Sequence, residues 1–168
     1  GACIIKFGKN VEPEFVAISE ERLIRQKYPY TFPLHSILYC MKYFKIKNLK
    51  DINIIVSDWI RIKKWLRSGP SYNYQTFDFI KENLNFNKKK IIQINHHLAH
   101  AASAYYSSDF NSSAILIVDG NGSDVETNSY YLGINNKIKF IDSYKNYGIG
   151  AAYGAVTKEI LNLGTGGE

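Results

Sequence analysis

Residues 91–123 read IIQINHHLAHAASAYYSSDFNSSAILIVDGNGS, and this stretch decides the fold class. Its apolar residues 91–94 predict a strand, and the alanine-rich segment 96–106, which lacks Gly and Pro, favours a helix. The apolar residues 113–118 predict a second, buried strand that ends in a Gly-rich turn. Strands and helices mixed along one chain indicate the α/β class.

Further elements are predicted on both sides of this stretch. The additional strands expected are, in chain order, residues 2–7, 15–19, 53–57, 129–134 and 138–143. The additional helices expected are residues 33–44, 76–84 and 148–163. We expect a charged turn at Glu20-Glu21-Arg22, a buried strand at residues 53–57, a hairpin turn at Asn135-Asn136 and a helix stop at Gly164.

Length and composition narrow the class of protein. The chain has 168 residues, of which 45% are hydrophobic and 21% charged, as in a single folded domain and unlike disordered or coiled-coil chains. Its apolar runs are far shorter than the roughly 20 residues that cross a bilayer, so no membrane span is expected. Two cysteines without a CxxC pattern, and no charged-then-apolar leader, predict a cytoplasmic setting without disulfides.

The net charge of +6 is unevenly distributed. Residues 1–90 hold 17 basic and 8 acidic side chains, whereas residues 91–168 hold 4 and 7. A positive first half can attract phosphate-bearing small molecules or nucleic acid, but clustered lysines are also typical of a solvated surface. Charge alone therefore selects no partner.

His96 and His100 are the strongest candidates for metal ligands. A step of four residues on a helix places both imidazoles on one face, where they can share an ion. Zinc proteases with this spacing carry a Glu beside the first His as general base, and position 97 is His, so that class is excluded. The alternative is a pair of unrelated polar histidines at a helix start.

Asp119 is the candidate third ligand, because it follows the strand at residues 113–118. A His, His, Asp set suits iron, zinc or manganese and leaves positions for solvent or substrate. The alternative is a turn Asp that caps its own loop.

Two further segments are candidates for binding oxyanions. In the turn after Asp119, the absent side chains of Gly120 and Gly122 would let backbone N–H groups approach phosphate, although hairpin turns use the same residues. In the segment 20–27, basic side chains can pair with phosphate or carbamoyl oxygens, although a solvated charged turn has the same composition. The residues concerned are Gly120, Asn121 and Gly122 in the turn, and Arg22, Arg25 and Lys27 in the basic segment.

In order and spacing, these motifs resemble the N-terminal domain of the NodU/CmcH O-carbamoyltransferase family. The stretches that carry the resemblance are SEERLIRQK (19–27), HHLAHAASAYY (96–106), VDGNG (118–122) and GTGGE (164–168). The resemblance implies an incomplete actin, sugar kinase and Hsp70-like (ribonuclease H-like) lobe, with a mixed sheet and flanking helices. We therefore expect residues 1–168 to be a partial N-terminal domain, with a first strand, a second lobe and a YrdC-like domain outside it, and to be inactive alone.

The resemblance also implies a reaction and its site. A carbamoyl group would pass from carbamoyl adenylate, made from carbamoyl phosphate and ATP, to a hydroxyl of a small molecule. His96, His100 and Asp119 would bind Fe(2+) or another divalent metal, and Lys27 would contact substrate or adenylate; no general base is assigned. Tyr28 stands where the family often has His. The alternatives are a tRNA threonylcarbamoyl transferase-like protein, although nucleic acid is not the expected partner, and a noncatalytic nucleotide-binding lobe.

Overall fold

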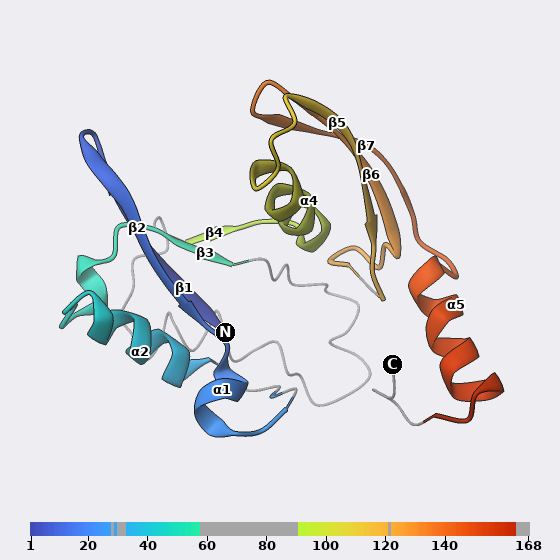
Figure 1. Cartoon of the computed structure of the whole chain (residues 1–168), viewed down its shortest axis with the longest axis horizontal. Helices are drawn as coiled ribbons and strands as arrows, with labels where there is room; N and C mark the ends of the chain where they lie inside the picture. The colour runs from blue at the N-terminus through green and yellow to red at the C-terminus, as the bar shows by residue number, and fades with distance from the viewer. Residues whose placement is uncertain (28, 30–32, 58–90, 121, 164–168) are drawn as a thin grey trace. The chain divides into compact units, whose positions relative to one another are not determined.

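The computed structural model describes residues 1–27, 29, 33–57, 91–120 and 122–163 (Figure 1). Strands and helices are mixed along these residues, as the sequence predicted, and neighbouring strands pair antiparallel both in the hairpin at residues 2–18 and in the sheet at residues 112–144. The chain divides into two compact units, with residues 1–55 in the first and residues 92–163 in the second. The helix predicted at residues 76–84 and the helix stop predicted at Gly164 lie outside the described residues.

The first unit is a hairpin covered by a helix. Strands β1 (Ala2–Gly8) and β2 (Val11–Ile18) pair antiparallel, with Ala2 opposite Ile18. Helix α2 (Leu34–Tyr43) contacts both strands, and a short helix, η1 (Leu49–Asp51), follows it. The thiol of Cys40 on α2 is buried and lies 3.6 Å from the carbonyl oxygens of both Ala2 and Val16. Cys40 is therefore a packing residue.

The charged turn predicted at residues 20–22 is wrong, because helix α1 (Glu20–Ile24) begins there. The Glu20 side chain is 3% exposed and bonds to both backbone N–H groups and both side chains of His35 and Ser36. These two residues form the first turn of α2, whose N-cap residue Pro33 makes no side-chain hydrogen bond. Glu20, which is distant in sequence, therefore accepts the N–H hydrogen bonds that an N-cap side chain would otherwise accept.

The ionisation of Glu20 depends on these donors. Burial alone would raise the pKa of Glu20, but hydrogen bonds from Ser36 and His35 outweigh it and lower the pKa to about 2.

The second unit packs one helix on a three-stranded sheet. Strands β5 (Ser112–Val118), β6 (Asn128–Ile134) and β7 (Lys137–Tyr144) are antiparallel in the order β5-β6-β7, and Asn135-Asn136 forms the predicted turn. Helix α4 (His96–Tyr106) lies against this sheet (Figure 1). The core contains Ala101 and Tyr105 from α4 and Ile115, Ile117 and Tyr131 from the sheet.

Two strands expected to be buried are exposed on one side. On β5, Ile115 and Ile117 are buried while Leu116 is 54% exposed, since α4 packs on one face of the antiparallel sheet. Strand β3 (Ile55–Ser57) is shorter than predicted, and Val56 is 58% exposed. Within the described ranges, β3 pairs with β4 (Ile91–Gln93) in a two-stranded sheet, which cannot bury both faces.

The last predicted helix is shorter than expected. Helix α5 (Ile149–Ala155) continues into a π-helical turn, η4 (Val156–Ile160), and the helical backbone ends there. In the part of the chain that the structure describes, each helix is too short or too polar to cross a membrane.

We predict that Glu20→Gln lowers the free energy of unfolding at neutral pH by about 1–3 kcal/mol, because a neutral amide binds the donors of α2 more weakly. The folded-state pKa of Glu20 lies below its unfolded value. Its stabilisation is therefore fully present above about pH 4.5 and is lost as pH falls toward 2. Urea unfolding across this window should show a flatter pH dependence for the variant. Glu14→Gln, at an exposed position on β2, is the control and should behave as wild type.

We predict that Gly133→Ala on β6 destabilises the second unit by about 1–3 kcal/mol through overpacking. A Cβ at this position would lie 2.6 Å from Tyr105 Cδ2, and the ring cannot move freely because its hydroxyl donates to the Asn111 carbonyl at 2.9 Å. Thermal unfolding followed by circular dichroism measures the loss. Gly154→Ala on α5 has open space around its Cβ and should be neutral or slightly stabilising. Equal melting temperatures for the two variants would contradict the packing argument.

Candidate metal centre

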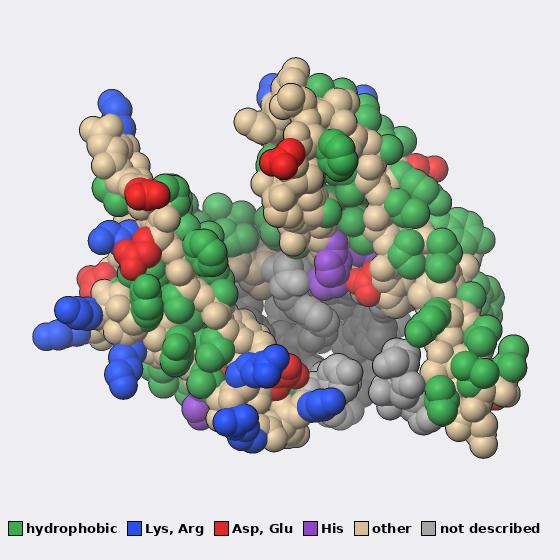
Figure 2. Space-filling view, in the orientation of Figure 1, with side chains coloured by type: hydrophobic (Ala, Val, Ile, Leu, Met, Phe, Trp, Pro, Cys, Tyr) green, Lys and Arg blue, Asp and Glu red, His purple; other side chains and the backbone are tan. Residues whose placement is uncertain are grey.

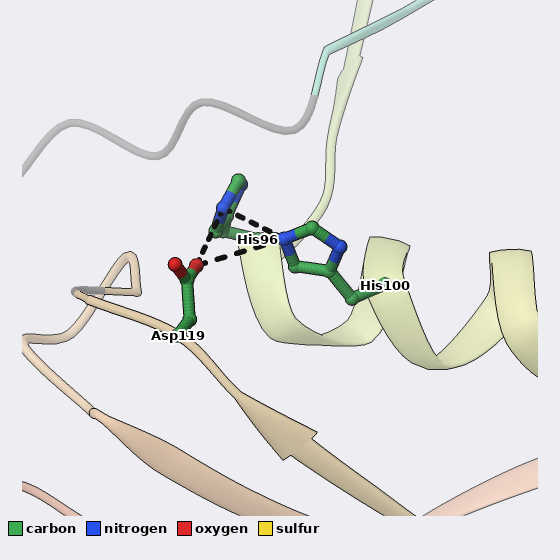
Figure 3. Close-up of side chains that lie close together, drawn as sticks. All are labelled: His96, His100 and Asp119. Atoms are coloured by element: carbon green, nitrogen blue, oxygen red, sulfur yellow. Dashed lines mark hydrogen bonds and ion pairs between the residues drawn. The ribbon is translucent and has the colours of Figure 1, made fainter. Parts of the chain in front are cut away.

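Asp119 stands directly after β5, where the backbone is still fixed to the sheet. Its N–H donates to the Thr127 carbonyl at 2.9 Å, and its Oδ1 accepts the Gly120 N–H at 2.6 Å. Asp119 therefore does cap its own loop with Oδ1. The other carboxylate oxygen, Oδ2, is directed toward α4 (Figure 3).

His96 and His100 lie on one face of α4, as their spacing predicted. Their Nε2 atoms are 3.0 Å apart. The distance to Asp119 Oδ2 is 2.9 Å from His96 Nε2 and 3.6 Å from His100 Nε2 (Figure 3). The structure thus brings the three predicted ligands together, with one donor atom from each within 4.8 Å of the others.

The spacing of these atoms suits a shared cation. Ligand atoms bound to one ion at about 2.1 Å lie about 3 Å apart at right angles and about 3.4 Å apart at the tetrahedral angle. Asp119 Oδ2 is buried and accepts no hydrogen bond from the residues that the structure describes. Its closest ion-pair contact is with His96 Nε2, at 2.9 Å. A buried carboxylate oxygen of this kind needs a positive partner, which a metal ion would supply. The residues present fit a divalent metal.

The site is accessible at the surface of the second unit. The side chain of His96 is 28% exposed and that of His100 is 50% exposed. Figure 2 shows histidine side chains beside an acidic side chain on this face. Substrate or solvent can therefore reach the open side of the cluster.

The loop that follows Asp119 is bonded to the first residues of α4. The N–H of His96 donates to Ser123 Oγ at 2.9 Å. Asn95 caps the helix, since its Oδ1 accepts the Leu98 N–H at 3.0 Å, and its Nδ2 donates to Glu126 Oε1 at 2.8 Å. These bonds fix the two histidines relative to the end of β5. An Asn directly before a helix is a signal that sequence analysis could have used, whereas nothing local marks Ser123 or Glu126.

Glu126 is a second buried carboxylate held by N–H donors. It is 3% exposed. Burial would raise the pKa of Glu126, but hydrogen bonds from Asn95 and from backbone N–H groups, that of Asp124 among them, lower it below its ordinary value. Glu126 is therefore ionised at neutral pH and binds the helix cap as an anion.

The glycines of the Gly-rich turn make their contacts within the loop itself. The Gly122 N–H donates to the Glu126 carbonyl at 2.7 Å, and a Cβ on Gly122 would lie 2.5 Å from Glu126 Cδ. A larger residue at position 122 would therefore clash with the Glu126 side chain. Since the Gly120 N–H is also bonded, to Asp119, a phosphate role for either glycine stays a prediction. Asn121 lies outside the described residues.

The basic candidates Arg22, Arg25 and Lys27 belong to the first unit, on α1 or directly after it. All three are exposed, and Figure 2 shows Lys and Arg side chains gathered near α1. Arg25 ends the helix with a left-handed backbone, at φ 60°. Exposure leaves these side chains available to an anion, and their predicted contact with substrate stays a prediction. Tyr28 lies outside the described residues.

His97 is the residue of this region that sequence analysis missed, since it served there only to exclude a protease. It is fully buried, and its Nδ1 lies 2.7 Å from Ser129 Oγ. Burial is the main influence on the pKa of His97 and lowers it, and the carboxylates of Glu126 and Asp119 act in the opposite direction.

Comparison with known proteins finds a family model that matches more than half of the chain. The model of the family described as "Carbamoyltransferase N-terminus" matches residues 62–163, which include His96, His100 and Asp119. Over 165 aligned positions, the chain is 27% identical to "Uncharacterized protein sll1178" of Synechocystis sp. (strain ATCC 27184 / PCC 6803 / Kazusa), covering 82% of this chain and 26% of that protein. Over 145 positions it is 28% identical to "Nodulation protein NolNO" of Sinorhizobium fredii (strain NBRC 101917 / NGR234), covering 73% and 20%. The alignments thus cover about a quarter or less of these relatives.

We predict that Asn95→Ala lowers stability by about 1 kcal/mol through loss of the helix cap. Asn95→Asp keeps the cap acceptor but places a carboxylate where Nδ2 now donates, 2.8 Å from Glu126 Oε1. Repulsion should therefore make the Asp variant less stable than the Ala variant at neutral pH, although Asp is a good cap elsewhere. Urea unfolding of both variants tests this order. An Asp variant as stable as wild type would show that the Asn95–Glu126 contact does not hold the loop.

Proposed function

The chain belongs to the family of carbamoyltransferase N-terminal domains, and on that basis we propose that it is part of an O-carbamoyltransferase that modifies a hydroxyl of a small molecule. Membership confirms the family expected from the motifs of the sequence. The observation that carries the proposal is the convergence of His96, His100 and Asp119 on one point within the matched region. We further propose that the chain forms an actin, sugar kinase and Hsp70-like lobe, and the mixture of strands and helices supports this proposal.

The His, His, Asp cluster is the proposed metal centre of this enzyme. His96 Nε2, His100 Nε2 and Asp119 Oδ2 would hold Fe(2+) or another divalent ion. Such an ion, when bound, polarises a carbamoyl or phosphate oxygen as a Lewis acid. Three protein ligands on an exposed face leave room for substrate.

The proposed reaction is transfer from carbamoyl adenylate, which a YrdC-like domain would make from carbamoyl phosphate and ATP. The acceptor oxygen attacks the carbamoyl carbon, the bond from this carbon to the phosphate oxygen breaks, and AMP leaves with the electron pair. The acceptor hydroxyl loses its proton to a base that we do not assign. The chain's own part is to hold the metal ligands in place and to position the reactants.

The basic segment is the proposed site for the adenylate. The guanidinium groups of Arg22 and Arg25 can pair with phosphate oxygens in a bidentate manner, and Lys27 adds a point charge. These cations would stabilise AMP as the leaving group. Their exposure in the structure supports this role.

We predict that the intact protein binds one divalent ion per chain and that His100→Ala and Asp119→Asn each weaken its binding at least tenfold. Metal analysis after dialysis against Fe(II) under anaerobic conditions measures this. His35→Ala is the matched control, because this histidine lies in the first unit and should leave the metal content unchanged. Release of AMP from carbamoyl adenylate in the presence of a hydroxyl acceptor should fall in the ligand variants only.

Two results would overturn the proposal. Wild-type protein without bound metal would remove the centre. Salt-sensitive tRNA binding without carbamoyl transfer to small hydroxyl compounds would favour the tRNA-modifying alternative.

A further inference from the structure

A buried nitrogen without a hydrogen bond in the described part of the chain, His97 Nε2, lies beside the candidate metal centre. It is 3.8 Å from Asp119 Oδ2, which itself lies 2.9 Å from His96 Nε2. A buried polar atom left unpaired costs about 1–3 kcal/mol. Asp119 Oδ2 is an acceptor close to His97 Nε2, so a small approach of the two groups would satisfy this nitrogen.

The other side of the His97 ring determines where its hydrogen lies. Ser129 Oγ is 2.7 Å from Nδ1. An ionised Asp119 can only accept, so the facing Nε2 must carry a hydrogen for the contact to be attractive. Nδ1 then accepts from the Ser129 hydroxyl. The two ring nitrogens of His97 then have different roles, with Nδ1 as acceptor and Nε2 as donor.

His97 is not placed to be a ligand itself. Its side chain is 0% exposed, whereas His96 and His100 both reach the surface. Within the described residues, the group that can share an ion contains His96, His100 and Asp119 but not His97. His97 meets the cluster at Asp119 Oδ2, 3.8 Å from its Nε2, so we consider its effect on the metal through that carboxylate.

We propose that His97 is a positioning residue whose Nε2–H donates to Asp119 Oδ2 and directs that oxygen toward His96 and His100 for metal binding. The inference rests on the proposed function, because it assumes a cation at the cluster. The Gly120 N–H already holds Oδ1, so a donor at Oδ2 fixes the whole carboxylate. Oδ2 has two lone pairs, and one remains for the ion. Donors of this kind typically change metal affinity by 10–100-fold.

Two substitutions of His97 by amide residues test the roles of its two nitrogens independently. The amide nitrogen of Gln reaches about as far as Nε2, so His97→Gln keeps a donor toward Asp119. The shorter Asn reaches about as far as Nδ1, so His97→Asn keeps only the Ser129 side. We expect His97→Asn to raise the dissociation constant for Co(II) about 10–100-fold, and His97→Gln to stay within about threefold of wild type. Competition with a chelator measures the constant in the intact protein, and the visible absorption of bound Co(II) reports the ligand set.

Melting temperatures without metal separate positioning from folding. A purely structural His97 would make both variants lose apo stability and would leave their Co(II) affinities equal, which overturns the inference. If His97→Asn does not fold, Ser129→Ala decides: loss of the hydroxyl that fixes the His97 hydrogen should weaken Co(II) binding about tenfold. Unchanged binding in that variant would also overturn it.

The same titration distinguishes failure of this inference from failure of the proposed function. Wild-type protein that binds neither Co(II) nor Fe(II) removes the metal centre, and the inference falls with it. Tight wild-type binding that is lost in Asp119→Asn but is unchanged in His97→Asn leaves the centre in place and refutes only the role of His97.

Discussion

The second unit depends on the bonding between the loop after β5 and the first residues of α4. Ser123 accepts the His96 N–H, and Glu126 accepts from Asn95, which in turn caps the helix. The histidines and Asp119 belong to separate elements. Without these contacts, the ends of those elements could move independently. The same loop supplies Asp119 at its start and the anchoring residues a few positions later. A short connection thereby fixes both the acid and the helix that carries its partners.

Buried carboxylates are used in the same way in both units. Glu20 binds the N–H groups at the start of α2, and Glu126 binds the residue that caps α4. In each case burial opposes ionisation, and hydrogen-bond donors outweigh it, so the pKa is lowered. Helix N-termini carry unsatisfied donors and a partial positive charge, which makes a buried anion tolerable there. Both helices are therefore positioned by acids that lie elsewhere in the chain.

The packing of the second unit keeps His96 and His100 at the surface while burying His97. Tyr105 fills the space beside Gly133, so α4 lies close against β6. This close approach buries His97 and leaves His96 and His100 exposed. Three histidines within five residues thus meet different environments, because successive positions on a helix point in different directions.

The sequence by itself determined what depends on neighbours along the chain. Helical spacing placed His96 and His100 on one face, the apolar run 113–118 placed Asp119 at a strand end, and Asn135-Asn136 marked the hairpin turn. Only the tertiary structure decided what depends on distant partners: that Glu20 is a buried cap rather than part of a solvated turn, that β5 is buried on one face, and that His97 faces Asp119. Glu20 meets Ser36 across 16 positions, and His97 meets Ser129 across 32. Side-chain periodicity reports which direction a residue points, but the group that it meets is set by the packing of separate elements.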